Sequence, residues 1–132
     1  EIKKNIMGTN YYAIPKATEE LRKRIISAVE RGDFINAKIM IPDKIHIGKS
    51  SGGWQFCFNH NDWKYFEKNR ESIEFFLLSC EIFDEYDMCI SNYDFWQMVE
   101  AKKQGKAHLI WNGQECGFIE AGLNFSNSIN FS

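Results

Sequence analysis

Two alternating runs of apolar residues, separated by a stretch rich in glycine, constrain the fold of this chain more than any other part of its sequence. Ile45 and Ile47 alternate with polar residues up to Gly48, and a second alternating run with two phenylalanines begins at Trp54. Alternation with a period of two is typical of a β-strand with one buried face. Glycine allows positive φ and a close approach of the backbone to other groups. The sequence therefore predicts two strands joined by a loop over Gly48–Trp54.

The other segments predict a mixture of strands and helices. A strand is predicted over 9–14, and two short strands around a turn over 82–90. Asn112-Gly113 between two apolar runs predicts a β-hairpin over 108–119. Apolar spacing and capping residues predict three helices, over 18–31, 71–80 and 91–104. We therefore expect an α+β fold, with a mostly antiparallel sheet of about five strands and about three helices packed on it.

The length of 132 residues predicts a single domain over 1–132. Residues 1–6 read as a polar leader before Met7, and 34–41 are ambiguous between helix and strand. Residues 123–132 are polar with spaced apolar side chains, which suits either an edge strand or a loosely docked tail.

Charge and cysteine content exclude several classes of protein. The formal net charge of −2 provides no broad basic field, so we expect no broad nucleic-acid binding. No apolar run is long enough to span a membrane. The four cysteines are scattered without a CxxC pair, and no signal peptide precedes them, which favours reduced thiols in the cytoplasm.

The loop carries a cation and two hydroxyls in one short span, Lys49, Ser50 and Ser51. Successive backbone N–H groups in a turn form a concave donor site for an anion. Gly48-Lys49-Ser50 matches the end of a phosphate-binding P-loop, but Asp43 occupies the position of the first glycine and a strand follows the loop. We therefore do not expect an NTPase, and two interpretations remain: a loop that binds an anion, or a tight turn whose lysine reaches water.

Three other groups of residues have both a functional and a structural interpretation. His46 and His60 could approach each other near Cys57 and bind zinc, but close ligand pairs are absent, so we predict no metal and no cofactor. The adjacent Tyr11 and Tyr12 point to opposite faces of a strand, so one of them is available to a ligand. Trp54 serves either as the wall of a ligand site or as a core residue.

Three motifs resemble a family of small uncharacterised bacteriophage and prophage proteins. They are Gly8-Thr9-Asn10-Tyr11-Tyr12, the loop from His46 to Trp54, and Asp84-Glu85-Tyr86, and the resemblance covers most of residues 7–104. It implies a phage origin, expression inside a bacterial host, and no assigned activity. Many members carry a CxxC pair before the loop, whereas residues 37–43 here contain no cysteine. The loop, rather than a metal, is therefore expected to be the part that the family shares.

These observations favour a binding protein over an enzyme. We expect it to act in the bacterial cytoplasm and to recognise a host protein or a small phosphorylated ligand, with inhibition of a host defence system as one use. The residues expected to bind are Asn10, Tyr11, Tyr12, His46, Lys49, Ser50, Ser51 and Trp54. One alternative is a small hydrolase or nucleotide-modifying enzyme with His46 as general base. The other is a purely structural loop, with function on an unmarked surface.

Overall fold

The computed structural model describes residues 8–64 and 66–127. The predicted leader at 1–6 and the end of the predicted tail, 128–132, lie outside the described residues. The helical elements are α2 (Glu19–Glu30), α3 (Phe34–Met40), α4 (His60–Trp63), α5 (Arg70–Leu77), α6 (Asn92–Ala101) and the 3₁₀ helix η1 (Lys102–Gln104). The strands are β1 (Thr9–Pro15), β2 (Ile45–Ser50), β3 (Cys57–Asn59), β4 (Cys80–Asp84), β5 (Cys89–Ile90), β6 (Ile110–Trp111), β7 (Gln114–Glu115), β8 (Gly117–Glu120) and β9 (Leu123–Ser126).

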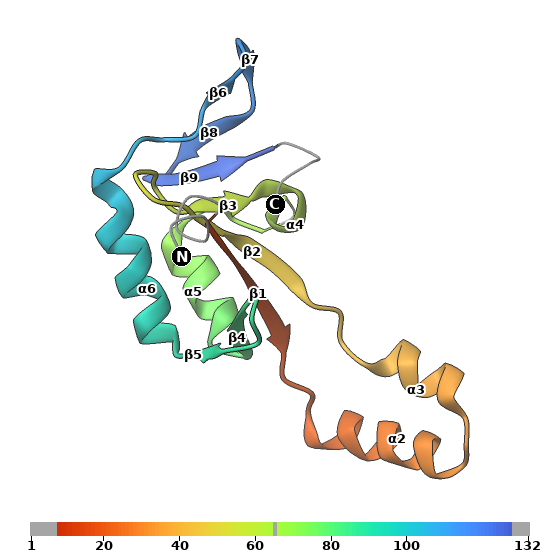
Figure 1. Ribbon diagram of the computed structural model, residues 1–132. Coiled ribbons are helices and arrows are strands. Elements are labelled where there is room, and N and C mark those ends of the chain that lie inside the picture. Colours follow the sequence, from red (N-terminus) through yellow and green to blue (C-terminus); the bar gives the residue numbers. More distant parts are fainter. Residues whose placement is uncertain (1–7, 65, 128–132) are drawn as a thin grey trace.

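Seven of these strands form one mixed sheet in the order β5-β4-β1-β2-β3-β9-β8. All neighbours are antiparallel except β3 and β9, which pair in parallel. Phe125 of β9 thus lies beside Phe58 of β3, which is 67 residues earlier in the sequence. β6 and β7 form a separate two-stranded hairpin that projects beyond β8 (Figure 1).

The helices α5 and α6 cover one face of this sheet. Ile73 and Leu77 of α5 and Phe95 of α6 belong to the same buried cluster as Ala13 of β1 and Ile82 of β4. Ala13 pairs directly with Ile82, so both side chains point to the helical face. Tyr12 pairs with Phe83 and therefore points to the opposite face of the sheet. We call this second face the open face.

A helical hairpin made of α2 and α3 projects from the sheet between β1 and β2 (Figure 1). Thr18 caps α2 by accepting a hydrogen bond from the backbone N–H of Leu21, and Asp33 caps α3 in the same way from Asn36. The fully buried residues of the hairpin are two alanines, Ala28 and Ala37. The hairpin, called the arm from here on, is therefore well capped and adds no large side chain to the core.

The α+β class predicted from the sequence is confirmed, but the arrangement differs in three respects. The sheet has seven strands instead of about five, and although it is mostly antiparallel as expected, it contains one parallel pair, β3 with β9. The ambiguous segment 34–41 forms α3, and residues 123–126 form a buried inner strand, β9, instead of an edge strand or loose tail. The predicted hairpin over 108–119 is divided, because β6 and β7 pair with each other while 117–120 join the main sheet. Among the described residues, no helix is long and apolar enough to cross a membrane.

Candidate functional site

A β-bulge at Ile47 determines which side chains meet on the open face. Tyr11 pairs with Gly48 and Tyr12 pairs with His46, so Ile47 is an extra residue on β2. In a regular strand, His46 and Lys49 would point to opposite faces. Because of the bulge, His46 shares the face of Tyr12, and Lys49 shares the face of its partner Asn10. The buried Trp63 supports the bulge by donating from its indole Nε1 to the carbonyl oxygen of Ile47, at 3.0 Å.

His46 lies at the centre of a polar cluster on this face. Its ring stacks on Tyr12, with ring centroids 4.9 Å apart, and its Nε2 lies 2.9 Å from Asn10 Oδ1. Asn10 Nδ2 donates to Glu85 Oε1, which leaves Oδ1 as the atom that faces the imidazole. Nε2 of His46 therefore carries the proton in this network. Lys44 Nζ lies 4.3 Å from the centroid of the Tyr12 ring. We call Asn10, Tyr12, Lys44, His46 and Lys49 the His46 cluster.

The two nearest carboxylates are hydrogen-bonded to the backbone of the cluster. Asp62 Oδ2 accepts from the N–H of His46 at 2.7 Å, and Glu85 Oε1 accepts from the N–H of Asn10 at 2.6 Å. Through these bonds Asp62 holds the backbone of β2 and Glu85 holds the backbone of β1. Each carboxylate thereby accepts a charge-assisted hydrogen bond. Lys44 and Lys49 therefore lie in the same cluster as two hydrogen-bonded carboxylates.

Burial favours the neutral forms of the titratable side chains around Lys49. Burial is the main cause that lowers the pKa of His46 and of His108, and Lys49 lowers both further. Burial raises the pKa of Cys57 to about 12, with Cys116 as a second cause, although Lys49 acts in the opposite direction. Cys57 is therefore a neutral thiol at pH 7, and both histidines tend to be neutral imidazoles.

The loop predicted over Gly48–Trp54 is shorter in the structure, because β2 continues to Ser50, and the turn over 51–54 is held against the segment that follows α6. Lys106 donates its N–H to the carbonyl of Gly53 and accepts from the N–H of Gln55, at 3.0 and 2.9 Å. Lys102 Nζ donates to the carbonyl oxygen of Ser51 at 3.0 Å. The ring of Trp54 meets His108 edge to face, with centroids 5.6 Å apart. The loop is therefore an anchored turn that has lysines of the 102–106 segment at its border.

The structure divides the eight site residues predicted from the sequence into three groups. Asn10, Tyr12, His46 and Lys49 meet on the open face. Tyr11 belongs to the helical face, where its ring contacts Phe56 and Phe95. Ser50 pairs with Thr9 and lies on the face opposite to Lys49, so it belongs to the same group as Tyr11. Ser51 and Trp54 lie in the anchored turn.

Sequence reasoning did not single out Lys44, Asp62 or His108 as parts of this site. Lys44 directly precedes β2 and lies two residues before His46. This spacing, which places two strand residues on the same face, was the signal that could have identified it. Asp62 and His108 come from other elements, and no local pattern links them to β2. His60, considered as a partner of His46, instead meets the ring of Phe118 on β8. Within 8–64 and 66–127, no three His, Cys, Asp or Glu side chains are grouped to hold a metal ion.

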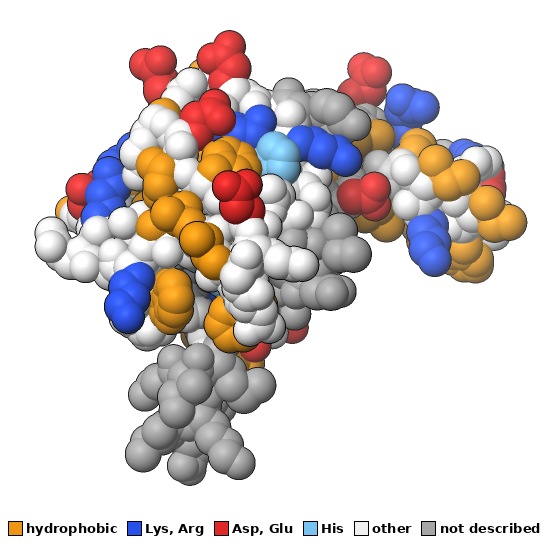
Figure 2. All heavy atoms as spheres, turned by 90° about the horizontal axis from the view of Figure 1, so that it is seen from above, with side chains coloured by type: hydrophobic (Ala, Val, Ile, Leu, Met, Phe, Trp, Pro, Cys, Tyr) orange, Lys and Arg blue, Asp and Glu red, His pale blue; other side chains and the backbone are white. Residues whose placement is uncertain are grey.

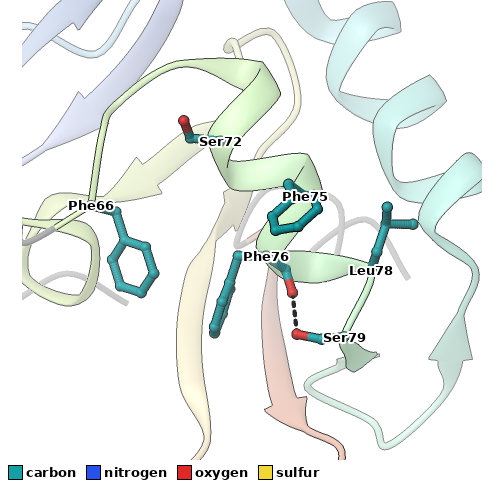
Figure 3. Close-up of a pocket in the computed structure, with 6 residues that line it drawn as sticks. All are labelled: Phe66, Ser72, Phe75, Phe76, Leu78 and Ser79. Atoms are coloured by element: carbon teal, nitrogen blue, oxygen red, sulfur yellow. Dashed lines mark hydrogen bonds between the residues drawn. The ribbon is translucent and has the colours of Figure 1, made fainter.

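A hollow of about 530 Å³ lies elsewhere on the surface, beside α5 (Figure 3). Aromatic side chains dominate its lining, which consists of Phe66, Ser72, Phe75, Phe76, Leu78 and Ser79. The Ser79 hydroxyl donates to the carbonyl of Phe76 at 2.7 Å, as the dashed line in Figure 3 marks. The hollow contains none of the eight predicted site residues.

Comparison with known proteins does not assign the chain to a group. No family model, no curated protein and no solved structure matches it.

Proposed function

We propose that this protein is a small accessory binding protein that recognises an anionic group with the His46 cluster and the adjoining loop. The observation that carries the proposal is the bulge at Ile47, which places His46 and Lys49 on one face with Asn10 and Tyr12. A strand irregularity that re-aims side chains is a common device at functional sites. The anionic group belongs to a small phosphorylated ligand or to an acidic surface of a host protein.

The charges around the loop support an anion in preference to a cation. Lys44 and Lys49 border His46, and the ammonium group of Lys102 contacts the turn at the carbonyl oxygen of Ser51. The nearby carboxylates of Asp62 and Glu85 already accept backbone hydrogen bonds. An ammonium group is a strong point-charge partner for phosphate or carboxylate.

The hydrogen bonds of His46 support binding more than catalysis. Its Nε2 faces Asn10, and the imidazole also hydrogen-bonds with the backbone of Gly48. A general base must direct a lone pair towards the proton that it removes from a substrate. An imidazole held by protein groups serves better as a fixed wall of a binding site. The proposed setting, a phage-encoded protein inside a bacterial host, is supported by the resemblance of residues 7–104.

The proposal is tested first with inorganic phosphate as a probe, by NMR titration of the backbone amides. We expect the largest shifts at residues 46–54 and at His108, and at least about tenfold weaker binding for Lys49→Met, since one close cation–anion pair contributes 1.4 kcal/mol or more. Lys23→Met is the matched control, because Lys23 lies on the arm and pairs with Glu19. Equal affinity of the two variants contradicts the proposal.

Native mass spectrometry of the protein purified from a bacterial host is the second test. We expect a bound anionic metabolite or a host protein that Lys49→Met releases and Lys23→Met retains. A bound species that both variants retain to the same extent contradicts recognition through the His46 cluster.

A further inference from the structure

The arm exposes six large apolar side chains within a short helical hairpin. Ile26 and Val29 of α2 and Phe34, Ile35 and Ile39 of α3 are exposed, and so is Ile41 at the end of α3. Phe34, Ile35 and Ile39 are each at least 66% exposed. Figure 2 shows the arm as the lobe at the right, with hydrophobic side chains at its surface. Apolar patches larger than a few hundred Å² on a soluble protein mark interaction sites.

The arm has only a small core of its own, in which two alanines are buried and Leu21, Ile25 and Met40 are half-buried. Its fully buried side chains are those of Ala28 and Ala37, and α3 contains only seven residues. Isolated helices shorter than about 12 residues are marginal in water, since helices in proteins are stabilised mainly by packing an apolar face. The exposed isoleucines are therefore the side chains whose burial would stabilise α3.

From these features we propose that the arm is the interface of a homodimer, in which the arms of two copies pack on each other as four helices. Ile26 and Val29 lie three residues apart and share one side of α2, while Ile35 and Ile39 lie four apart and share one side of α3. A two-fold axis requires a surface that is complementary to itself. Two apolar helices side by side meet this requirement, as in helical bundles.

The area and the charge of the arm both fit a second copy of this chain. At these exposures the six apolar side chains present on the order of 600 Å² per copy, and a standard specific interface buries about 800 Å² per partner. The arm carries five basic and four acidic residues, so its charges are nearly balanced and two arms do not strongly repel each other. The basic residues are Arg22, Lys23, Arg24, Arg31 and Lys38, and the acidic ones are Glu19, Glu20, Glu30 and Asp33.

The test is the mass of the full chain in solution, measured by light scattering and sedimentation over a range of concentrations. We expect twice the 15.5 kDa of one chain for the wild type and 15.5 kDa for the double variant Ile35→Glu/Ile39→Glu. Phe75→Glu is the matched control, because Phe75 is as exposed as Ile35 but lies on α5, and we expect it to stay dimeric.

A second variant guards against loss of folding in the arm. Ile35→Ala/Ile39→Ala keeps strong helix formers at both positions, and we expect at least about a hundredfold weaker dimerisation with unchanged helical circular dichroism. A wild type that is monomeric at every concentration overturns the proposal. A dimer that persists in both arm variants overturns it as well. So does a dimer that Phe75→Glu dissociates as completely as the arm variants do. The His46 cluster lies outside the arm, so phosphate binding reports on the proposed function separately.

Discussion

At the scale of single residues, Gly48 shows how the loop motif serves packing as well as chemistry. A Cβ added to Gly48 would collide with the carbonyl oxygen of Cys57 and with the ring of Phe56. The residue is buried in β2, and its φ lies outside the left-handed region. Glycine is required here because another chain segment passes close to its Cα, and not because of an unusual backbone conformation.

We therefore expect Gly48→Ala to destabilise the protein by about 1–3 kcal/mol, the usual cost of adding a methyl group to a packed site. Urea unfolding followed by tryptophan fluorescence measures this change. Ser50→Ala, two positions further along the same strand, removes an atom instead and should change the free energy of unfolding by less than about 1 kcal/mol. Equal effects of the two substitutions would show that both the Cys57 carbonyl and the Phe56 ring move aside at little cost.

His46 makes stability depend on pH at the same scale. Burial lowers its pKa below the ordinary 6.5, so the unfolded chain binds a proton more readily than the folded chain does. The free energy of unfolding is therefore unaffected well above pH 6.5 and falls as the pH drops from 6.5 towards the lower, folded-state pKa. His60 and His108 shift in the same direction.

We expect His46→Gln to reduce this loss of unfolding free energy at low pH. The reduction is at most about 1.4 kcal/mol for each pH unit between the pKa of His46 in the unfolded chain and its pKa in the folded chain. Urea unfolding at several pH values between about 5 and 7.5 measures the slope, in a range above the titration of most carboxylates. The slope that remains should come from His60 and His108. If His46→Gln keeps the full slope of the wild type, the imidazole of His46 is not the group that titrates.

At the scale of elements, Asn124 connects β9 to the segment that borders the site. Asn124 is 1% exposed, accepts from the N–H of His108, and donates to the carbonyls of His108 and Phe118. Asn124→Ala leaves buried backbone groups without partners and should cost about 2–4 kcal/mol. It should also speed amide hydrogen exchange at His108. Asn127→Ala, at an exposed position just beyond β9, should leave both measurements unchanged.

The elements that local patterns specify could be predicted from the sequence. Thr18 and Ser91 cap helices where the sequence places them, since each side chain accepts from a backbone N–H three residues later. The alternation of Ile45, Ile47 and Phe58 predicts the antiparallel pairing of β2 with β3, which the structure has. Local propensity and periodicity act within a few residues, so these features can be read directly.

Features that depend on distant segments could not be predicted in this way. The alternation at 45–47 assigns His46 and Lys49 to opposite faces, whereas the bulge at Ile47, supported by Trp63, places them together. The parallel pairing of β9 with β3 joins segments 67 residues apart that no local signal links. The sequence therefore provided most members of the candidate site, and long-range packing decided which of them meet.

At the scale of the whole molecule, the sheet with its two covering helices and the arm are separate in their packing. The buried cluster contains residues of β1, β2, α5 and α6, but none of α2 or α3. The strands that carry the arm are already paired with each other beyond its base, from Thr9 with Ser50 to Ala13 with Ile45. The sheet and the His46 cluster should therefore fold without the arm.

We expect a chain in which a flexible linker of about six residues replaces residues 18–43 to fold as a monomer. The shorter connection should favour folding by about 1 kcal/mol through its smaller closure entropy. Urea unfolding should therefore give a free energy at least equal to that of the monomeric variant Ile35→Glu/Ile39→Glu, which is the proper reference because it lacks the dimer contribution. NMR should show the amide signals of Asn10 and His46 unchanged. Their hydrogen-bond acceptors, Glu85 and Asp62 respectively, lie outside the deleted segment. An unfolded product would mean that the arm stabilises the sheet through contacts other than the buried cluster.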